Sequence, residues 1–343
     1  MVLEVLPQIE KRSRILPVGG PVSLDVTNRE AINPKRPIAP WSIPGEAAHP
    51  NVGQGSYAEE AVTSAALIRI SKFSTPSCVR ATALYWESTP AVSVRVVIGQ
   101  GCKQLAVRPA IKARSVLGDS TMLHAPALFD HGSGRRFAFL VEQLVFGDHP
   151  RSVSEKLAAG SEVIDRLMSA HSTIGVKHRI PLAHPDTRQR LQALFENVLP
   201  SPGLPRLDEI LDAAGKLVET RSTVPTGWIH GDLVFSNLIA DPFGHLHLID
   251  WEHAAVRPVI ADLAKLAAAM PGPDGVAQVL DQGSSLEAPV GGLSIRDQLA
   301  RFYLQEISWW ERKHQRAIEA HRLEAFESWA NRRFGLLGPL LER

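Results

Sequence analysis

The chain has 343 residues, which is long enough to bury a sizeable core and to form two domains. Its formal net charge of +1 gives no electrostatic basis for binding nucleic acid. No apolar run reaches the length of a membrane span, the N-terminus lacks the features of a secretion signal, and only two cysteines occur, so we expect a cytoplasmic protein without disulfides.

The first third of the chain is predicted to contain an arm and a strand-rich domain. Residues 1–57 are rich in proline and weakly periodic, which predicts an extended arm. Residues 58–145 are predicted to form a nucleotide-binding domain that begins with a helix over 57–71 and has a short helix over 112–117 between its strands. Alternating, valine-rich stretches predict strands over 79–86, 91–98, 102–108, 127–129 and 136–145.

Residues 146–343 are predicted to form a mainly helical domain that holds the catalytic loop and the acceptor site. Helical periodicity is expected over 152–173, 186–198, 206–220, 258–270, 295–313 and 315–336. One hairpin interrupts these helices: residues 237–240 and 245–249 read as strands, and Asp241-Pro242-Phe243-Gly244 has the residues of a tight turn. The fold class is therefore α+β.

Polar residues that carry phosphoryl-transfer chemistry gather around this hairpin. Asp232 precedes the hairpin, Asn237 opens it, and Asp250 follows it directly. A hairpin returns Asn237 and Asp250 to the same end, as one bound metal ion requires. Carboxylate and amide oxygens suit Mg²⁺, and a further acid can orient or deprotonate an attacking hydroxyl. The alternative is that Asp232 and Asp250 are loop acids that only make turn hydrogen bonds.

The motif resembles that of the aminoglycoside phosphotransferase and choline kinase family. The resemblance rests on His230-Gly231-Asp232, Asn237, Ile249-Asp250-Trp251-Glu252, Pro258 and Asp262-Leu263-Ala264. It implies a two-lobed, protein-kinase-like fold, with an antiparallel sheet in the N-lobe and a mainly helical C-lobe. It also implies transfer of the γ-phosphate of ATP to a hydroxyl of a small molecule, with Asp232 as the catalytic acid–base group and Asn237 and Asp250 as Mg²⁺ ligands. In this motif His230 and Asp262 are expected to be structural.

The resemblance also implies where the nucleotide binds. Leu140–Leu144 looks like the family's hinge, so we expect the backbone of Val141, Glu142 and Leu144 to read the adenine, whatever the side chain of Glu142. Ile239 and Ile249 are expected to form the floor of the nucleotide site. The strand lysine that holds phosphates in kinases is replaced by Arg108 in the predicted third strand, with Lys112 as the alternative. Residues 112–124 contain no Glu to pair with either cation.

Several alternatives stay open at the level of sequence. The acceptor is an amino alcohol, an aminoglycoside or a sugar-like molecule, and the sequence does not separate ATP from GTP or indicate an oligomeric state. Five aromatic residues could enclose a quaternary ammonium group, although helix core is the better interpretation: Trp251, Tyr303, Trp309, Trp310 and Trp329. Arg108, the missing Glu and a loop without glycine at 87–90 favour a second function class, a pseudokinase-like binding or regulatory protein.

Overall fold

The computed structural model describes most of the chain after residue 66. The described residues are 67–70, 78–85, 91–99, 107–118, 123–134, 136–179, 186–198, 211–212, 215–217, 222–272, 274–282, 292–319 and 321–341. The predicted arm at 1–57 and most of the helix predicted at 206–220 lie outside them.

The chain divides into two compact units. The sheet unit holds the described residues up to Gly118, together with Leu123–Pro150 and Ser236–His253. The helical unit holds Arg151–Phe235 and Ala254–Arg343. The division differs from the predicted one because the hairpin segment 236–253 belongs to the sheet unit, although helices flank it in the sequence.

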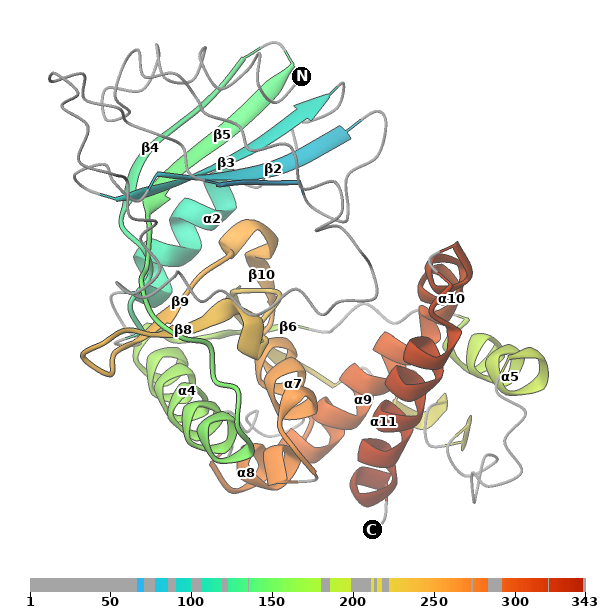
Figure 1. Ribbon diagram of the computed structural model, residues 1–343. Coiled ribbons are helices and arrows are strands. Elements are labelled where there is room, and N and C mark those ends of the chain that lie inside the picture. Colours follow the sequence, from blue (N-terminus) through green and yellow to red (C-terminus); the bar gives the residue numbers. More distant parts are fainter. Residues whose placement is uncertain are drawn as a thin grey trace, which may run out of the picture. The chain divides into compact units, whose positions relative to one another are not determined.

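The sheet unit contains the expected five-stranded antiparallel sheet, in the order β1-β2-β3-β5-β4. A helix, α2 (Val107–Ala113), continues as a π-helical segment, η4 (Arg114–Gly118), and lies against one face of the sheet (Figure 1). Valine and alanine fill the interior, and Val92, Val94, Val96 and Ala83 are almost completely buried. The strands are β1 (Leu67–Ile70), β2 (Cys78–Tyr85), β3 (Val92–Gly99), β4 (Leu128–Ser133) and β5 (Phe137–Gln143).

Two predictions about this sheet are wrong: the number of strands stays at five, but the predicted first and second strands are the second and third of the structure. Residues 67–70, predicted to be helical, form β1, which pairs with β2 from Leu67↔Leu84 to Ile70↔Ala81. A short apolar run is ambiguous between helix and strand, and here the pairing partner decides. Val107 and Arg108, predicted to end a strand, open helix α2 instead; Pro109, which a first helical turn tolerates, is the signal for that start.

The predicted hairpin is confirmed as β8 (Leu238–Ala240) and β9 (Leu246–Leu248). Gly244 supplies the positive φ of the turn, 85°, and its N–H donates to the carbonyl of Asp241 at 2.9 Å. The hairpin is fixed within the sheet unit, because Asp148 and Ala240 exchange backbone hydrogen bonds of 3.0 and 2.9 Å. Gly147 permits this approach: a Cβ there would lie 2.0 Å from the carbonyl oxygen of Ala240.

The helical unit is built mainly from amphipathic helices. Helix α4 begins with a capping box, in which Ser152 Oγ accepts from the Glu155 N–H at 3.2 Å and Glu155 Oε2 accepts from the Ser152 N–H at 2.9 Å. Within this unit α8 packs on α4 and α7, and α9 packs on α7 and α11 (Figure 1). The helices are α4 (Val153–Ile174), α5 (Thr187–Asn197), α7 (Ile260–Ala269), α8 (Asp274–Gln282), α9 (Ile295–Ser308), α10 (Trp310–Glu319) and α11 (Leu323–Leu341).

The helical unit also contains short strands. A three-stranded sheet that the sequence did not predict has the order β10-β7-β6, with β6 (Lys177–Arg179), β7 (Val224–Ile229) and β10 (Ala255–Pro258).

The core interpretation of the aromatic residues is confirmed for Trp251, Tyr303 and Trp310, which are buried, whereas Trp309 is exposed. Within the described residues, no helix is long and apolar enough to cross a bilayer.

Candidate active site

A cavity of about 210 Å³ lies within the sheet unit. Strands β2 and β3, the end of β5 with the segment that follows it, and the β8–β9 hairpin all contribute to its walls. Its polar lining includes Arg95, Glu142, Asn237, Asp250 and Glu252. The two predicted metal ligands therefore share one cavity with most of the predicted adenine site.

Arg95 on β3 is the cation of this cavity, and the sequence analysis missed it. Its Nη1 donates to Asp250 Oδ1, and its Nε lies 3.4 Å from Glu142 Oε2. Burial alone would lower the pKa of Arg95, but the negative charges of Glu142 and Asp250 outweigh burial and raise it. The signal in the sequence was a charge in the middle of an apolar strand, since such residues are rarely buried unless paired.

Glu142 on β5 links Arg95 to a second guanidinium group. The Glu142 side chain is 2% exposed, and its Oε1 accepts from Arg114 Nη2 in η4. The Glu142 side chain therefore has a role that the sequence did not indicate, because this carboxylate balances two positive charges in a largely buried place. A cation on β3 is thus paired with an acid on the neighbouring strand β5, and η4 supplies a second cation.

Asn237 and Asp250 lie at the same end of the hairpin, as predicted. The N–H of Ile249 donates to the carbonyl of Asn237 at 2.9 Å, which ties the two ends together. Asp250 has a φ of 69°, a left-handed conformation that is uncommon outside glycine and tends to persist at functional sites. Among the described residues no three His, Cys, Asp or Glu side chains form a metal site. The oxygen donors of Asn237, Asp250 and Glu252 fit Mg²⁺, which needs only one or two protein ligands beside substrate phosphates.

The predicted adenine-binding residues line the cavity with one exception. Glu142, Leu144, Ile239 and Ile249 line it, whereas Val141 is fully buried in the sheet and does not. The backbone of this segment is partly engaged already. The N–H of Gln143 donates to the Ala127 carbonyl at 2.8 Å, and the N–H of Leu144 donates to the Ala91 carbonyl at 2.9 Å.

The candidate catalytic loop belongs to the helical unit as far as Phe235. Asp262, in the first turn of α7, binds the backbone of this loop. Its Oδ2 accepts from the His230 N–H at 2.6 Å and its Oδ1 accepts from the Gly231 N–H at 2.8 Å. Burial raises the pKa of Asp262, although the two backbone donors oppose that rise. This matches the structural role predicted for Asp262. The side chain of Asp232 is 42% exposed, and its Oδ1 accepts from Lys265 Nζ at 3.2 Å.

Neither residue predicted to supply the phosphate-binding cation lies on a strand. Arg108 is in the first turn of α2 and its side chain lies outside the described part, so the strand-phase argument that pointed to it is wrong. Lys112 is exposed in the last turn of the same helix. Arg95 occupies the position in the third strand that the sequence analysis assigned to Arg108.

Comparison with known families agrees with this geometry. The model of the phosphotransferase enzyme family matches residues 103–302, more than half of the chain. The chain belongs to the phosphotransferase enzyme family. The match spans α2, η4, both halves of the motif and α7, and it begins after Arg95, so the strand cation of this phosphotransferase lies outside it.

Solved structures show that the fold is that of protein-kinase-like phosphotransferases. A spectinomycin phosphotransferase, crystallised with ADP and spectinomycin, is similar with a TM-score of 0.53 at 11% identity, over 80% of this chain and 92% of that one. A choline/ethanolamine kinase family protein from Mesorhizobium loti has a TM-score of 0.50 at 15% identity, over 80% of this chain and 88% of that one. A comparison with curated proteins finds no match.

Proposed function

We propose that this phosphotransferase moves the γ-phosphoryl group of ATP to a hydroxyl of a small molecule. In that reaction the bond between the γ-phosphorus and the β–γ bridging oxygen breaks, a bond to the acceptor oxygen forms, and ADP leaves. Asp232 orients the hydroxyl and takes its proton late, because the charge of a loose transition state lies mainly on the phosphoryl oxygens.

The observation that carries the proposal is the composition of the cavity in the sheet unit. Its apolar lining includes Leu144, Ile239 and Ile249, which suit a nucleobase. The polar part holds Arg95, Asn237 and Asp250, which suit phosphates with a divalent cation. A cavity whose lining combines apolar side chains with a cation and metal-type oxygens is what a nucleoside triphosphate requires.

Within this cavity we propose that the Arg95 side chain binds the phosphates of the nucleotide and that the backbone of Val145 binds the adenine. The guanidinium group of Arg95 can hold two phosphate oxygens at once, and Glu142 anchors it from the side. Val145 follows the two residues whose N–H groups donate to the carbonyls of Ala127 and Ala91, and it also lines the cavity. Asn237 and Asp250 would hold Mg²⁺, whose charge, when bound, neutralises the phosphates of the nucleotide.

One observation that favoured the pseudokinase alternative no longer favours it. The missing Glu of the segment 112–124 is replaced by Glu142, so the strand cation does have a carboxylate partner. The observation about the loop stays: residues 87–90 join β2 to β3 rather than the first two strands, but residues 71–77, which join β1 to β2, contain no glycine either. An intact set of Asp232, Asn237 and Asp250 favours an enzyme.

The test combines a binding and a transfer measurement on the full chain. Calorimetric titration with ATP, GTP and ADP, with and without Mg²⁺, is expected to show metal-dependent binding of a nucleoside triphosphate. Transfer from γ-labelled ATP is then measured against spectinomycin, choline, ethanolamine, further aminoglycosides and simple sugars, since the similar structures include a spectinomycin phosphotransferase and a choline/ethanolamine kinase family protein. Absence of nucleotide binding under all conditions would overturn the proposal in favour of a pseudokinase.

A further inference from the structure

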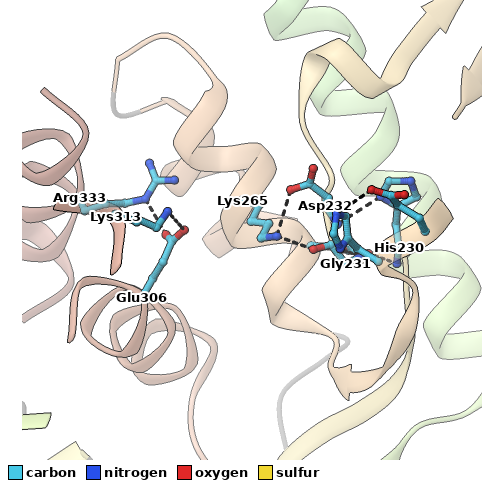
Figure 2. A network of polar contacts seen from close by, with 10 residues as sticks. His230, Gly231, Asp232, Lys265, Glu306, Lys313 and Arg333 are labelled. Atoms are coloured by element: carbon cyan, nitrogen blue, oxygen red, sulfur yellow. Dashed lines mark hydrogen bonds and ion pairs between the residues drawn. The ribbon is translucent and has the colours of Figure 1, made fainter. Parts of the chain in front are cut away.

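Lys265 is a cation that the catalytic motif does not contain but that contacts it directly. It lies on α7, three residues after Asp262, and reaches the loop that carries His230-Gly231-Asp232 (Figure 2). Its ammonium group donates to the carbonyl of Gly231 and lies 3.2 Å from Asp232 Oδ1. Residues 233–236, between Asp232 and Asn237, contain no lysine or arginine, so the cation at this acid comes from α7.

The other cations in the same view have different partners. Lys313 and Arg333 both contact Glu306, at 3.6 and 2.8 Å, in a cluster formed by α9, α10 and α11 (Figure 2). Lys313 also stacks on the ring of Trp329, with Nζ 4.3 Å from the ring centroid. These two cations are used in packing the helices together, whereas Lys265 is directed at the loop.

We infer that Lys265 is the positioning residue of Asp232. Helix α7 contacts the loop through two side chains that are one turn apart. Asp262 accepts from the N–H groups of His230 and Gly231. Lys265 donates to the Gly231 carbonyl and to the Asp232 carboxylate. The peptide group and the side chain that follows it are therefore held by the same ammonium. With Oδ1 engaged, rotation of the carboxylate about its last bond is restricted, so it meets the acceptor in one orientation.

This contact matters more for catalysis than for stability. Lys265 is 26% exposed and Asp232 42% exposed, and ion pairs of this exposure contribute little to folding. Orientation of a catalytic group is worth far more, since a misplacement of about 1 Å can cost roughly 100-fold in rate. Loss of Lys265 is thus expected to lower kcat while leaving the melting temperature nearly unchanged.

The inference rests on the proposed phosphoryl transfer, so its test has one arm that needs activity and one that does not. In the first arm, transfer from ATP is measured for Lys265→Met, with the alcohols of the panel above and water as acceptors. We expect kcat to fall about 100-fold with the KM for ATP within about twofold of wild type, and Lys265→Arg to recover part of the loss. Lys156→Met, which removes another partly buried lysine of the helical unit, is expected to leave kcat unchanged.

The double variant separates positioning from direct contact with the transferred group. In an Asp232→Asn background, Lys265→Met is expected to change kcat by about twofold or less, because its effect acts through the carboxylate. A persistent large effect in that background would overturn the positioning role.

The second arm is hydrogen exchange of the peptide covering residues 228–237, measured without substrate. Lys265→Met is expected to speed exchange there, and Lys156→Met to leave it unchanged, because Lys265 contacts this loop whereas Lys156 lies on α4. Unchanged exchange in Lys265→Met would overturn the inference even if the protein transferred no phosphoryl group. Faster exchange with no transfer by wild type would support the contact and count against the proposed function alone.

Discussion

Glu142 is the residue on which the charges of the cavity depend most. It lies between the guanidinium groups of Arg95 and Arg114, and its side chain is 2% exposed. Without this carboxylate the two positive charges would repel each other, Arg114 would lose its ion pair, and Arg95 would keep only its contact with Asp250, so the residues act as one electrostatic unit.

We therefore predict that Glu142→Gln destabilises the protein by about 3 kcal/mol or more, the usual cost of removing one partner of a buried ion pair. Glu162→Gln is the matched control, because Glu162 pairs with Arg166 on the surface of α4 and is 40% exposed. That change is expected to cost less than about 1 kcal/mol. Urea unfolding of both variants measures the difference, and equal losses would show that Glu142 does not hold a buried pair in solution.

Arg95 is predicted to carry the phosphate contact. Arg95→Met should weaken ATP binding by about 1.5–3 kcal/mol, the range of a hydrogen bond to a charged group, and Arg95→Lys should lose less because it keeps the charge without the fork. Lys112→Met, which removes an exposed lysine, is the control, and Arg108→Met tests the residue that the sequence favoured. Calorimetry that finds full affinity in Arg95→Met and a loss in either of the others would move the clamp to helix α2.

Asp262 is predicted to support the catalytic loop rather than to take part in the reaction. Asp262→Ala leaves the N–H groups of His230 and Gly231 without their acceptor, at a cost of about 1–3 kcal/mol for each buried group. Stability and turnover should fall together. Asp165→Ala, at an exposed position of α4, is the control for stability. Lost activity with an unchanged melting temperature would instead place Asp262 in the reaction.

At the scale of elements, local chemistry explains what the sequence could predict. The hairpin was predictable because its turn, from Asp241 to Gly244, uses residues with fixed conformational preferences. Helix α4 was predictable because its periodicity is long and its capping box is local. Strand β1 was not, because a short apolar run takes its conformation from the partner strand. Without β1 the predicted strands were numbered one too low, so the cation of the third strand was predicted to be Arg108 instead of Arg95.

The same contrast between local and distant determinants applies to the residues of the candidate site. Asn237, Asp250 and Asp262 are set by a motif of fixed spacing, and their places agree with the prediction. Glu142 is set by partners far along the chain, 28 residues away for Arg114 and 47 for Arg95, so no local pattern shows its role. The contact of Lys265 with Asp232 spans 33 residues and depends on how α7 faces the loop.

Helix α4 is predicted to make stability depend on pH. Its His171 is 2% exposed, and burial lowers its pKa from 6.5 to about 4. The unfolded chain binds a proton near pH 6.5 and the folded protein only near pH 4, so stability is fully present above pH 6.5 and is lost as pH falls toward 4. The shift corresponds to about 3 kcal/mol.

Urea unfolding at pH 7 and pH 4.5 measures this dependence for wild type and His171→Gln. The variant is expected to lose less stability than wild type between the two pH values, whatever its stability at pH 7. His131→Gln, at an exposed position of β4, should keep the wild-type slope. Equal slopes in all three proteins would show that His171 is not the group that titrates.

At the scale of the whole molecule, the motif is divided between the two units. The sheet unit holds the cavity with Arg95, Asn237 and Asp250, and the helical unit holds Asp232 with its supports on α7. The chain passes from one unit to the other between Phe235 and Ser236, inside the motif itself. If the proposed function holds, we predict that nucleotide binding and acceptor activation can be separated by mutation, one in each unit.

The most direct test of the account is phosphoryl transfer by Asp232→Asn beside its nucleotide affinity. Asn keeps the size of the side chain but cannot take a proton, so we predict wild-type ATP affinity, an unchanged melting temperature and a kcat lower by about 10²–10⁴ or more. Single-turnover transfer from γ-labelled ATP to the acceptor found in the panel measures kcat, and calorimetry measures affinity. A folded Asp232→Asn protein that binds ATP and transfers at the wild-type rate would contradict the account.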